Sequence, residues 1–161
     1  MSETRTPTIR PLAADDHEAL LALARRLAAW FRPLDQMMLA IDLAQHKGWV
    51  ATEQGTIVAF LLYFLEDAEQ AELSWLAVDP DAQGRGLGSQ LLTQLEASLR
   101  SWGVTTLRLN TIPADHEAIF DATNAFYRQR GFDVEARHDD YYGHGRPALR
   151  LVKRLAVERV P

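Results

Sequence analysis

Residues 71–102 read AELSWLAVDPDAQGRGLGSQLLTQLEASLRSW and predict a strand, a glycine-rich turn and a helix in direct succession. The strand, Glu72 to Val78, is rich in apolar and aromatic residues, and Asp79-Pro80 ends it with a strong turn signal. An apolar stripe at helical spacing follows and predicts an amphipathic helix that ends at Gly103. The stripe consists of Leu87, Leu91, Leu92, Leu95, Leu99 and Trp102.

The turn between strand and helix, residues 83–89 (QGRGLGS), has the composition of a phosphate-binding loop. Three glycines, at 84, 86 and 88, leave the backbone free of side chains and able to take positive φ. The N–H groups in the first helical turn have no partner within the helix, and the helix dipole favours an anion in front of them. Arg85 adds a positive charge suited to phosphate.

The spacing of the glycines narrows the class of loop. The dinucleotide fingerprint GxGxxG fails because Ser89 stands where its third glycine belongs, and the nucleoside-triphosphate loop fails because no Lys-Ser or Lys-Thr follows. The pattern Q/R-x-x-G-x-G/A does match, through Gln83, Gly86 and Gly88. It resembles the pyrophosphate-binding motif of the GNAT superfamily of acyl-CoA-dependent N-acetyltransferases. A flexible loop before a surface helix is the alternative that this motif alone leaves open.

A second motif strengthens the resemblance. Residues 125–132 (AFYRQRGF) are similar to the GNAT signature A-x-Y-x-x-x-G-F, at about the expected distance from the glycine loop. The order of predicted elements is similar too. The resemblance implies an α/β (α+β) fold with a GNAT-like mixed, mostly antiparallel sheet, a splayed central parallel strand pair and about four flanking helices. It covers nearly the whole chain, so we expect a single N-acetyltransferase domain over residues 1–161.

Periodicity and turn residues predict the remaining elements. We expect a helix capped by Asp15-Asp16, a break at residues 31–33, and a second helix over roughly residues 34–46. Met37, Met38, Ile41 and Leu43 of this second helix are expected to pack in the core. A later helix, residues 119–130, should bury Phe120, Ala125 and Phe126. The strands are expected at residues 8–12, 49–52, 57–65, 105–111, 132–136 and 148–155, with a tight turn at 53–56.

Composition sets limits on function. The 161 residues are 47% hydrophobic and 24% charged, with a formal net charge of −5, which disfavours a general nucleic-acid or membrane-surface binder. No cysteine is present, which excludes disulfides, cysteine nucleophiles and thiolate metal sites. The five histidines show no metal-ligand spacing, so we expect no metal. The first residues have no apolar segment of signal-peptide type, and we expect a cytoplasmic protein.

The resemblance implies which residues hold acetyl-CoA. The backbone of the glycine loop would hold the pyrophosphate, and the end of the central strand would pair with the pantetheine arm and polarise the thioester carbonyl. Phe120 stands where many members have an asparagine that contacts the coenzyme, and Asn124 is the nearest polar substitute. The implied contacts are Leu76, Ala77, Val78, Gln83, Gly84, Arg85, Gly86, Leu87, Gly88, Ser89 and Asn124.

The resemblance also implies two catalytic residues. Tyr127 would protonate the departing thiolate, and Glu72 matches the position of a general base in some members. The base is needed because an amine with a pKa of about 10 is mostly protonated at neutral pH. A buried aromatic with no catalytic role is the alternative for Tyr127. A cross-strand ion pair, or a water relay in its place, is the alternative for Glu72.

The acceptor is the least defined part of the site. The resemblance places Trp30, Phe31, Tyr141 and Tyr142 along the acceptor channel. The neighbouring loops carry acidic residues that suit a cationic amine: Glu66, Asp67, Asp139 and Asp140. The alternative is that these residues only keep the loops solvated.

The sequence predicts an enzyme that moves an acetyl group from acetyl-CoA to a primary amine of a small molecule or peptide by direct attack. A catalytically silent acyl-CoA-binding regulatory module is the alternative, and an unrelated structural α/β domain is a third interpretation. We expect no nucleic-acid or membrane partner, and a homodimer is left open.

Overall fold

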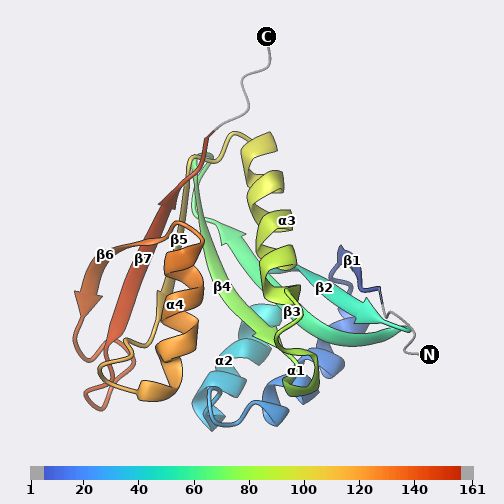
Figure 1. The fold of residues 1–161 in the computed structure, drawn as a ribbon, viewed down its shortest axis with the longest axis horizontal. Helices are drawn as coiled ribbons and strands as arrows, with labels where there is room; N and C mark the ends of the chain where they lie inside the picture. Colours follow the sequence, from blue (N-terminus) through green and yellow to red (C-terminus); the bar gives the residue numbers. More distant parts are fainter. Residues whose placement is uncertain (1–5, 157–161) are drawn as a thin grey trace. The chain divides into compact units, whose positions relative to one another are not determined.

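The computed structural model describes residues 6–156, whose strands form a seven-stranded sheet in the order β1-β2-β3-β4-β5-β7-β6 (Figure 1). Most neighbouring strands are antiparallel, and β4 and β5 form a parallel pair, so the predicted mixed α/β fold is confirmed. The strands are β1 (Thr8–Pro11), β2 (Lys47–Glu53), β3 (Thr56–Leu65), β4 (Gln70–Val78), β5 (Thr106–Thr111), β6 (Asp133–His138) and β7 (Ala148–Arg154). The helices are α1 (His17–Arg26), α2 (Pro33–Leu43), α3 (Leu87–Ser101) and α4 (Asp121–Gln129), with short 3-10 helices at Ala14–Asp16, Pro80–Ala82 and Ala118–Phe120.

The chain divides into two compact units. Unit 1 comprises the residues up to Phe64 together with Leu73–Ser98, and unit 2 comprises Leu65–Glu72 together with the residues from Leu99 onward. The first residues of β4 therefore belong to unit 2 and the rest of that strand to unit 1. The expectation of a single domain stays a prediction.

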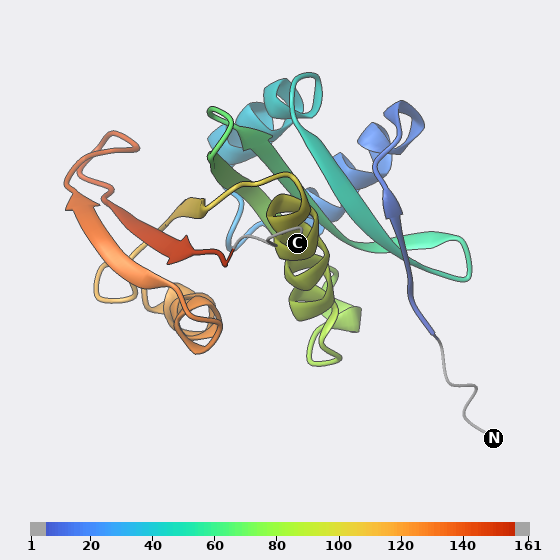
Figure 2. The same ribbon diagram turned by 90° about the horizontal axis from the view of Figure 1, so that it is seen from above.

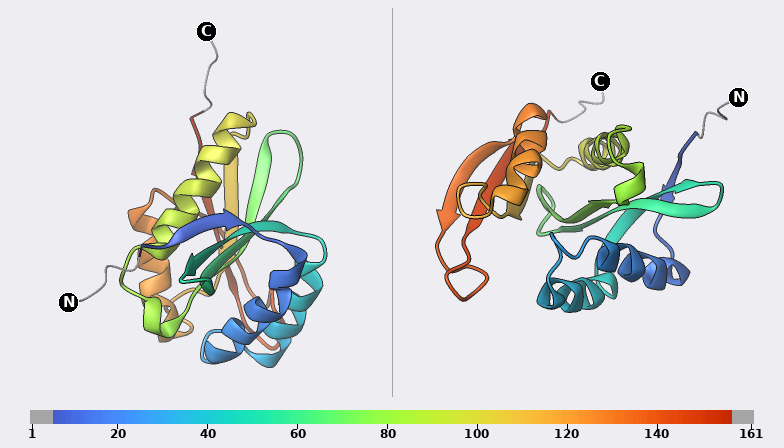
Figure 3. Two further views of the ribbon diagram at one scale, coloured as in Figure 1. Left: turned by 90° about the vertical axis from the view of Figure 1, so that its right-hand side faces the viewer. Right: turned by 60° about the horizontal axis from the view of Figure 1, so that its bottom comes forward.

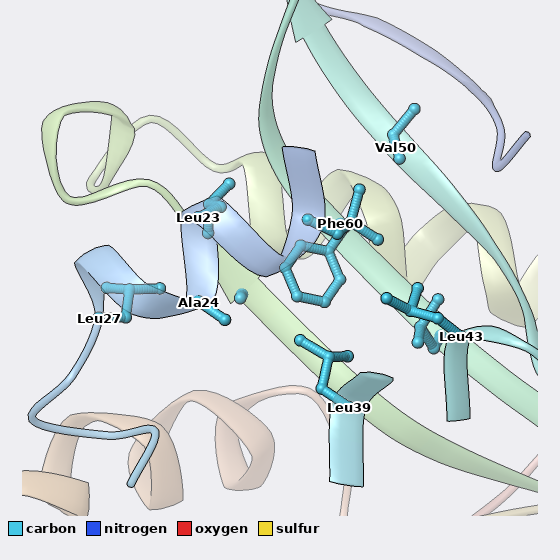
Figure 4. Packing of buried hydrophobic residues seen from close by; sticks show 10 residues of the cluster. Leu23, Ala24, Leu27, Leu39, Leu43, Val50 and Phe60 are labelled. Atoms are coloured by element: carbon cyan, nitrogen blue, oxygen red, sulfur yellow. The ribbon is translucent and has the colours of Figure 1, made fainter. Parts of the chain in front are cut away.

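Unit 1 has three layers. Helices α1 and α2 cover one face of strands β2–β4, and α3 lies on the opposite face (Figures 2 and 3). The layer under α1 and α2 is filled by aliphatic side chains around Phe60 of β3 (Figure 4). Because helices cover both of its faces, β3 is buried at five consecutive positions, 59–63, as its lack of polar alternation predicted.

The turn of the β2–β3 hairpin is determined by its local sequence. Gln54 and Gly55 have φ of 50° and 80°, the left-handed conformation that a two-residue hairpin turn requires. The turn lies within the predicted residues 53–56, and the strands on each side extend the predicted ones by one or two residues.

In unit 2, β7 pairs with both β5 and β6 in antiparallel register. Helix α4 packs beside these strands (Figure 2) and buries Tyr127 and Asn124. Gly131, with φ of 91°, ends the helix and leads into β6, as the sequence predicted.

Several predicted core positions are wrong. Met37, Met38 and Ile41 are 64%, 45% and 54% exposed, because α2 turns Leu39 and Leu43, four residues apart, toward the core. Trp102 is half exposed because α3 ends at Ser101. Trp102 lies outside the helix, so it does not continue the buried apolar stripe. Ala125 is exposed as well, since α4 buries the neighbouring Asn124 and Tyr127 instead.

The end of the second helix and the cap of the first also differ from the predictions. The second helix ends at Leu43 rather than near His46, because Gln45 and His46 donate to Asp42 in a tight turn before β2. Asp16 does not cap the first helix with its side chain; its carboxylate binds Arg10 at 2.8 Å and the backbone N–H of Ala13. In residues 6–156 no helix has the length and apolar character needed to cross a bilayer.

Candidate functional site

The glycine loop, residues 83–89, connects the 3-10 turn after β4 to the start of α3, and we call it the cradle. Gly84 and Gly86 take φ of 81° and 78°, a conformation that favours glycine. Gly88 lies in the first turn of α3, where Gln90 donates the first helical hydrogen bond to the Gly86 carbonyl at 3.0 Å. The preceding N–H groups of that turn are the ones that an α-helix leaves without an internal partner.

Four contacts fix the approach to the cradle. The Gln83 amide donates to the Val78 carbonyl at 3.2 Å, which holds the cradle against the end of β4. The Asp79 carboxylate accepts from the Asp81 N–H at 2.9 Å and also binds the Arg26 guanidinium. Arg26 reaches Asp81 as well, at 3.0 Å, so α1 braces the turn from the side. The cradle is therefore shaped before any ligand arrives.

Arg85, the charge expected to face phosphate, has a protein partner in this structure. Its Nη1 lies 2.7 Å from Oε1 of Glu53, the last residue of β2, whose side chain is only 5% exposed. Such a pair holds Arg85 in one orientation while about two fifths of its side chain stays exposed. Glu53 had not been singled out from the sequence, because 32 residues separate it from Arg85.

The cradle has room for a phosphate group. A Cβ placed on Gly84 or Gly86 would meet no heavy atom within 4 Å outside the adjacent residues, so both glycines border open space. Backbone N–H groups, a helix start and a held guanidinium are the donor set that anions bind in proteins. These residues fit the pyrophosphate of coenzyme A.

The end of β4 supplies the predicted pantetheine-binding residues. Ala77 is buried, whereas Leu76 and Val78 are half-buried. Trp75, which the sequence analysis did not single out, donates its indole N–H to Asp42 at 2.8 Å and packs against Phe31, with ring centroids 5.7 Å apart. Helix α2 and the segment before it thus hold the aromatic side chain of β4 in place.

Glu72, the predicted base, lies in a polar network of unit 2. We call it the Glu72 network, and its members are Glu66, Glu72, Asn110 and Arg150. Its Oε1 accepts from Nδ2 of Asn110 at 3.3 Å and lies 3.9 Å from Nη1 of Arg150. Asn110 and Arg150 are direct cross-strand partners on β5 and β7, and their side chains bond each other at 3.2 Å. The other terminal nitrogen of this guanidinium, Nη2 of Arg150, lies 3.8 Å from Oε1 of Glu66. The predicted alternative, an ion pair with a basic residue, is therefore present but long.

Burial outweighs the ion pair in setting the protonation of Glu72. Burial, and next the hydrogen bond with Glu66, raise the pKa of Glu72 to about 7, while Arg150 and Arg108 pull it down. A dominant ion pair would have lowered this pKa. Glu72 therefore has a proton affinity suited to accepting a proton near neutral pH.

Tyr127 lies on the buried face of α4 with 7% of its surface exposed. Phe126 and Phe132 pack edge-on against its ring, with centroids 5.2 Å and 5.5 Å away. Burial raises the pKa of Tyr127 above its usual range, so the phenol keeps its proton at physiological pH. The cradle is part of unit 1, whereas Tyr127 and the Glu72 network are part of unit 2.

Asn124, predicted to contact the coenzyme, uses its amide within the protein. Its Nδ2 donates to the Ile112 carbonyl at 3.0 Å, and its Oδ1 accepts from the Ala114 N–H at 3.0 Å. These bonds tie the segment after β5 to α4. They favour a structural role for Asn124, and coenzyme contact stays a prediction.

The four predicted acceptor residues fall into two groups. Trp30 and Phe31 are half-buried at the edge of the unit 1 core. Tyr141 is 55% exposed, packs edge-on against Tyr142 at 4.9 Å, and places its hydroxyl 3.5 Å from Nδ2 of Asn110. Within unit 2, the structure thus links one predicted acceptor residue, Tyr141, to the predicted base through Asn110.

The acidic loop residues differ in what they bind. Asp67 and Asp140 accept hydrogen bonds from backbone N–H groups of their own loops, and Asp139 lies 3.6 Å from Arg137. Of the four acids, only Glu66 joins the Glu72 network. Asn110 and Arg150 were missed by the sequence analysis, although both occupy polar positions in alternating strands and so mark the polar face of each.

No group of three or more His, Asp or Glu side chains in the described residues is placed to hold a metal ion.

Comparisons with known proteins identify proteins that are similar to this chain. A sequence model described as "Acetyltransferase (GNAT) family" matches residues 10–132. An amino-acid acetyltransferase of Pseudomonas putida is 34% identical over 133 residues, which is 82% of this chain and 29% of that protein. A 5-NmdU N-acetyltransferase of Pseudomonas phage PaMx11 is 29% identical over 78% of this chain and 86% of that protein. The chain spans less than a third of the length of the amino-acid acetyltransferases that it matches.

Solved structures share the fold. The ribosomal-protein-S18-alanine N-acetyltransferase from Escherichia coli superposes with a TM-score of 0.79 at 26% identity, over 96% of this chain and 97% of that one. Other structures with this fold, at 16–19% identity, were solved with acetyl-CoA or coenzyme A bound. With the family match covering most of its length, the chain belongs to the acetyltransferase (GNAT) family.

Proposed function

We propose that the chain transfers an acetyl group from acetyl-CoA to a primary amine of a small molecule or peptide by direct attack. The observation that carries the proposal is the cradle, in which two left-handed glycines border open space in front of a helix start. Acetyl-CoA supplies the acetyl group and a thiolate leaving group when it is bound.

The cradle's part is to bind and orient. Its backbone N–H groups and the start of α3 stabilise the pyrophosphate, and Arg85, held by Glu53, adds charge beside it. Leu76, Ala77 and Val78 align the pantetheine arm, and a backbone N–H there stabilises the developing negative charge.

Glu72 accepts the proton of the acceptor amine at a carboxylate oxygen. An amine with a pKa of about 10 is almost wholly protonated at pH 7, so it must lose a proton before or during attack. A base with a pKa of about 7 suits this task better than an ordinary glutamate, because it is still substantially ionised and binds the proton more strongly.

Tyr127 gives the proton of its hydroxyl to the departing sulfur. Burial raises its pKa, so the hydroxyl is available as a proton donor throughout the physiological range. The aromatic rings of Phe126 and Phe132 fix the orientation of the phenol.

The acceptor side favours a cationic amine. Glu66 and Glu72 give the network negative charge, and the exposed ring of Tyr141 offers a face for cation–π contact. The amino-acid and 5-NmdU acetyltransferase relatives bear names that fit small amine acceptors.

The test is a thiol-release assay with acetyl-CoA and a panel of acceptors. The panel contains amino acids, polyamines, aminoglycosides, aminomethyl nucleosides and peptides with free N-termini. Thiol release that depends on one amine, with the acetylated product seen by mass spectrometry, supports the proposal. If acetyl-CoA binds but no amine in the panel is acetylated, the chain is instead a silent acyl-CoA-binding module.

Tyr127→Phe is expected to lower turnover by about ten- to a thousand-fold, because it removes only the proton donor. Melting temperature and acetyl-CoA affinity should stay close to those of the wild type, since the ring packing is preserved. Steady-state kinetics with the identified acceptor provide the measurement. The matched control is Tyr63→Phe, which removes the hydroxyl of a buried tyrosine of β3 that has no assigned role and should leave turnover unchanged. Unchanged turnover in Tyr127→Phe would assign the acid role to another group or to water.

The acceptor KM is expected to rise several-fold between about 0.05 and 0.5 M salt, because screening weakens attraction between a cationic amine and an acidic network. The KM for acetyl-CoA measured in parallel separates this effect from weaker cofactor binding. The double variant Asp139→Asn/Asp140→Asn should change the acceptor KM little. The Asp139 carboxylate contacts Arg137 and the Asp140 carboxylate accepts from the Gly145 N–H, both close by in the chain. An acceptor KM independent of salt would contradict a cationic acceptor held by charge.

A further inference from the structure

The Glu72 network contains a second carboxyl group, Glu66, whose backbone is fixed by the turn before β4. The Glu66 N–H donates to the Gln70 carbonyl at 2.8 Å. The Asp67 carboxylate accepts from the N–H groups of Glu69 and Gln70 at 2.8 Å and 2.9 Å. This closed turn sets Glu66 next to the first residues of β4, so its carboxyl group does not depend on a flexible loop to reach Glu72.

Building on the proposed function, we propose that Glu66 is a positioning residue for the base. Its carboxyl group and that of Glu72 lie against the same guanidinium group, that of Arg150, and together the three groups set how readily Glu72 takes the proton of the acceptor. One guanidinium contacts both carboxyl groups: Arg150 places Nη2 3.8 Å from Glu66 and Nη1 3.9 Å from Glu72.

The charged groups around the carboxyl pair come from β5, β6 and β7. Arg108 of β5 binds Glu135 of β6 at 2.8 Å, and Arg150 also lies 3.7 Å from Glu135. Arg154 of β7 acts on Glu135 as well, so Glu135 has guanidinium partners of its own. The carboxyl groups of Glu66 and Glu72 share the guanidinium of Arg150, at 3.8 Å and 3.9 Å. Asn110, which donates to Glu72 and contacts the Tyr141 hydroxyl, is neutral. One proton on the carboxyl pair, or the ammonium of an acceptor, offsets the second negative charge.

Burial decides which member of the pair holds the proton. The Glu72 side chain is 16% exposed and that of Glu66 is 34% exposed, so ionising Glu72 costs more. The raised pKa of Glu72, caused first by burial and then by Glu66, agrees with this assignment. Two neighbouring carboxyl groups that share a proton are a recurring way to bring one of them near neutrality.

The test measures the protonation of Glu72 directly, by NMR titration of carboxyl-labelled glutamate in the full chain. Glu66→Gln should lower the pKa of Glu72 by about one unit, because it removes a negative charge and offers an amide donor to the ionised form. Arg150→Gln should raise this pKa, because it removes the opposing positive charge. Glu69→Gln, an equal charge change at an exposed position of the same turn, is the control and should leave it in place.

The two shifts in opposite directions are a signature that a merely structural role would not give. If Glu66→Gln leaves the pKa of Glu72 unchanged or raises it, the inference is overturned. The pH profile of kcat/KM for the acceptor gives an independent readout, and its acidic limb should move with the NMR value in both variants. An NMR shift without movement of the rate profile would overturn the role of Glu72 as the base, and with it the positioning role of Glu66. Failure of the proposed function as a whole would instead appear as no acetylation by the wild type.

Discussion

A Gly86→Val variant is expected to lose the thermal stabilisation that acetyl-CoA gives to the wild-type chain. Gly86 has φ of 78° and a Cβ there would enter open space, so the valine side chain would fill the volume that the pyrophosphate needs. It would also strain the backbone by about 1–2 kcal/mol, because an L residue disfavours left-handed φ. Thermal shift and calorimetric titration with acetyl-CoA measure both effects.

Backbone strain and lost binding are separated by a matched variant, Gly103→Val. Gly103 has φ of 81° and is equally unobstructed, but it follows the opposite end of α3. The 15-residue length of α3 separates it along the chain from the cradle. Both variants should melt at lower temperature without ligand, and only Gly86→Val should fail to respond to acetyl-CoA. Normal acetyl-CoA affinity in Gly86→Val would contradict the assignment of the cradle.

The sequence predicted those parts of the fold and site that local chemistry determines. The cradle was predicted from glycines able to take positive φ between an apolar strand and an amphipathic helix. In the structure, Gly84 and Gly86 have positive φ and lie between β4 and α3. The Gln54-Gly55 turn and the doubly covered β3 follow from similar local signals. The predicted splay of the central strand pair stays a prediction.

The parts that the sequence did not predict depend on pairing between distant segments. Asn110 and Arg150 meet because β5 and β7 pair in a register that makes them direct partners, 40 residues apart. Glu135 reaches Arg150 from an irregularity in the β6–β7 register between Val134 and Ala136. No local pattern specifies such a register. The exposed face of α2 has the same cause, because apolar residues occur around most of that helix and only packing selects Leu39 and Leu43.

Glu72→Gln is expected to lower turnover by about a hundred- to ten-thousand-fold, the usual effect of removing a general base. The amide oxygen of glutamine preserves an acceptor for the Asn110 donor, so acetyl-CoA binding should survive. In the wild type, kcat/KM for the acceptor should rise with pH through about 7 as Glu72 ionises, and the variant should lose this limb. Steady-state kinetics from pH 5.5 to 9 provide the measurement, with Glu69→Gln as the control for a charge change nearby.

Stability gives the same variant a second signature, independent of catalysis. Because the folded-state pKa of Glu72 lies above its ordinary value, the folded chain holds this proton more tightly than the unfolded chain does. The resulting stability is fully present below the ordinary pKa of glutamate and is lost as pH rises through about 7. Glutamine resembles the protonated form at every pH, so the melting temperature of Glu72→Gln relative to wild type should be higher at pH 8.5 than at pH 5. A difference that does not change with pH would contradict the raised pKa, whereas full turnover in the variant would assign proton removal to another group or to a water relay.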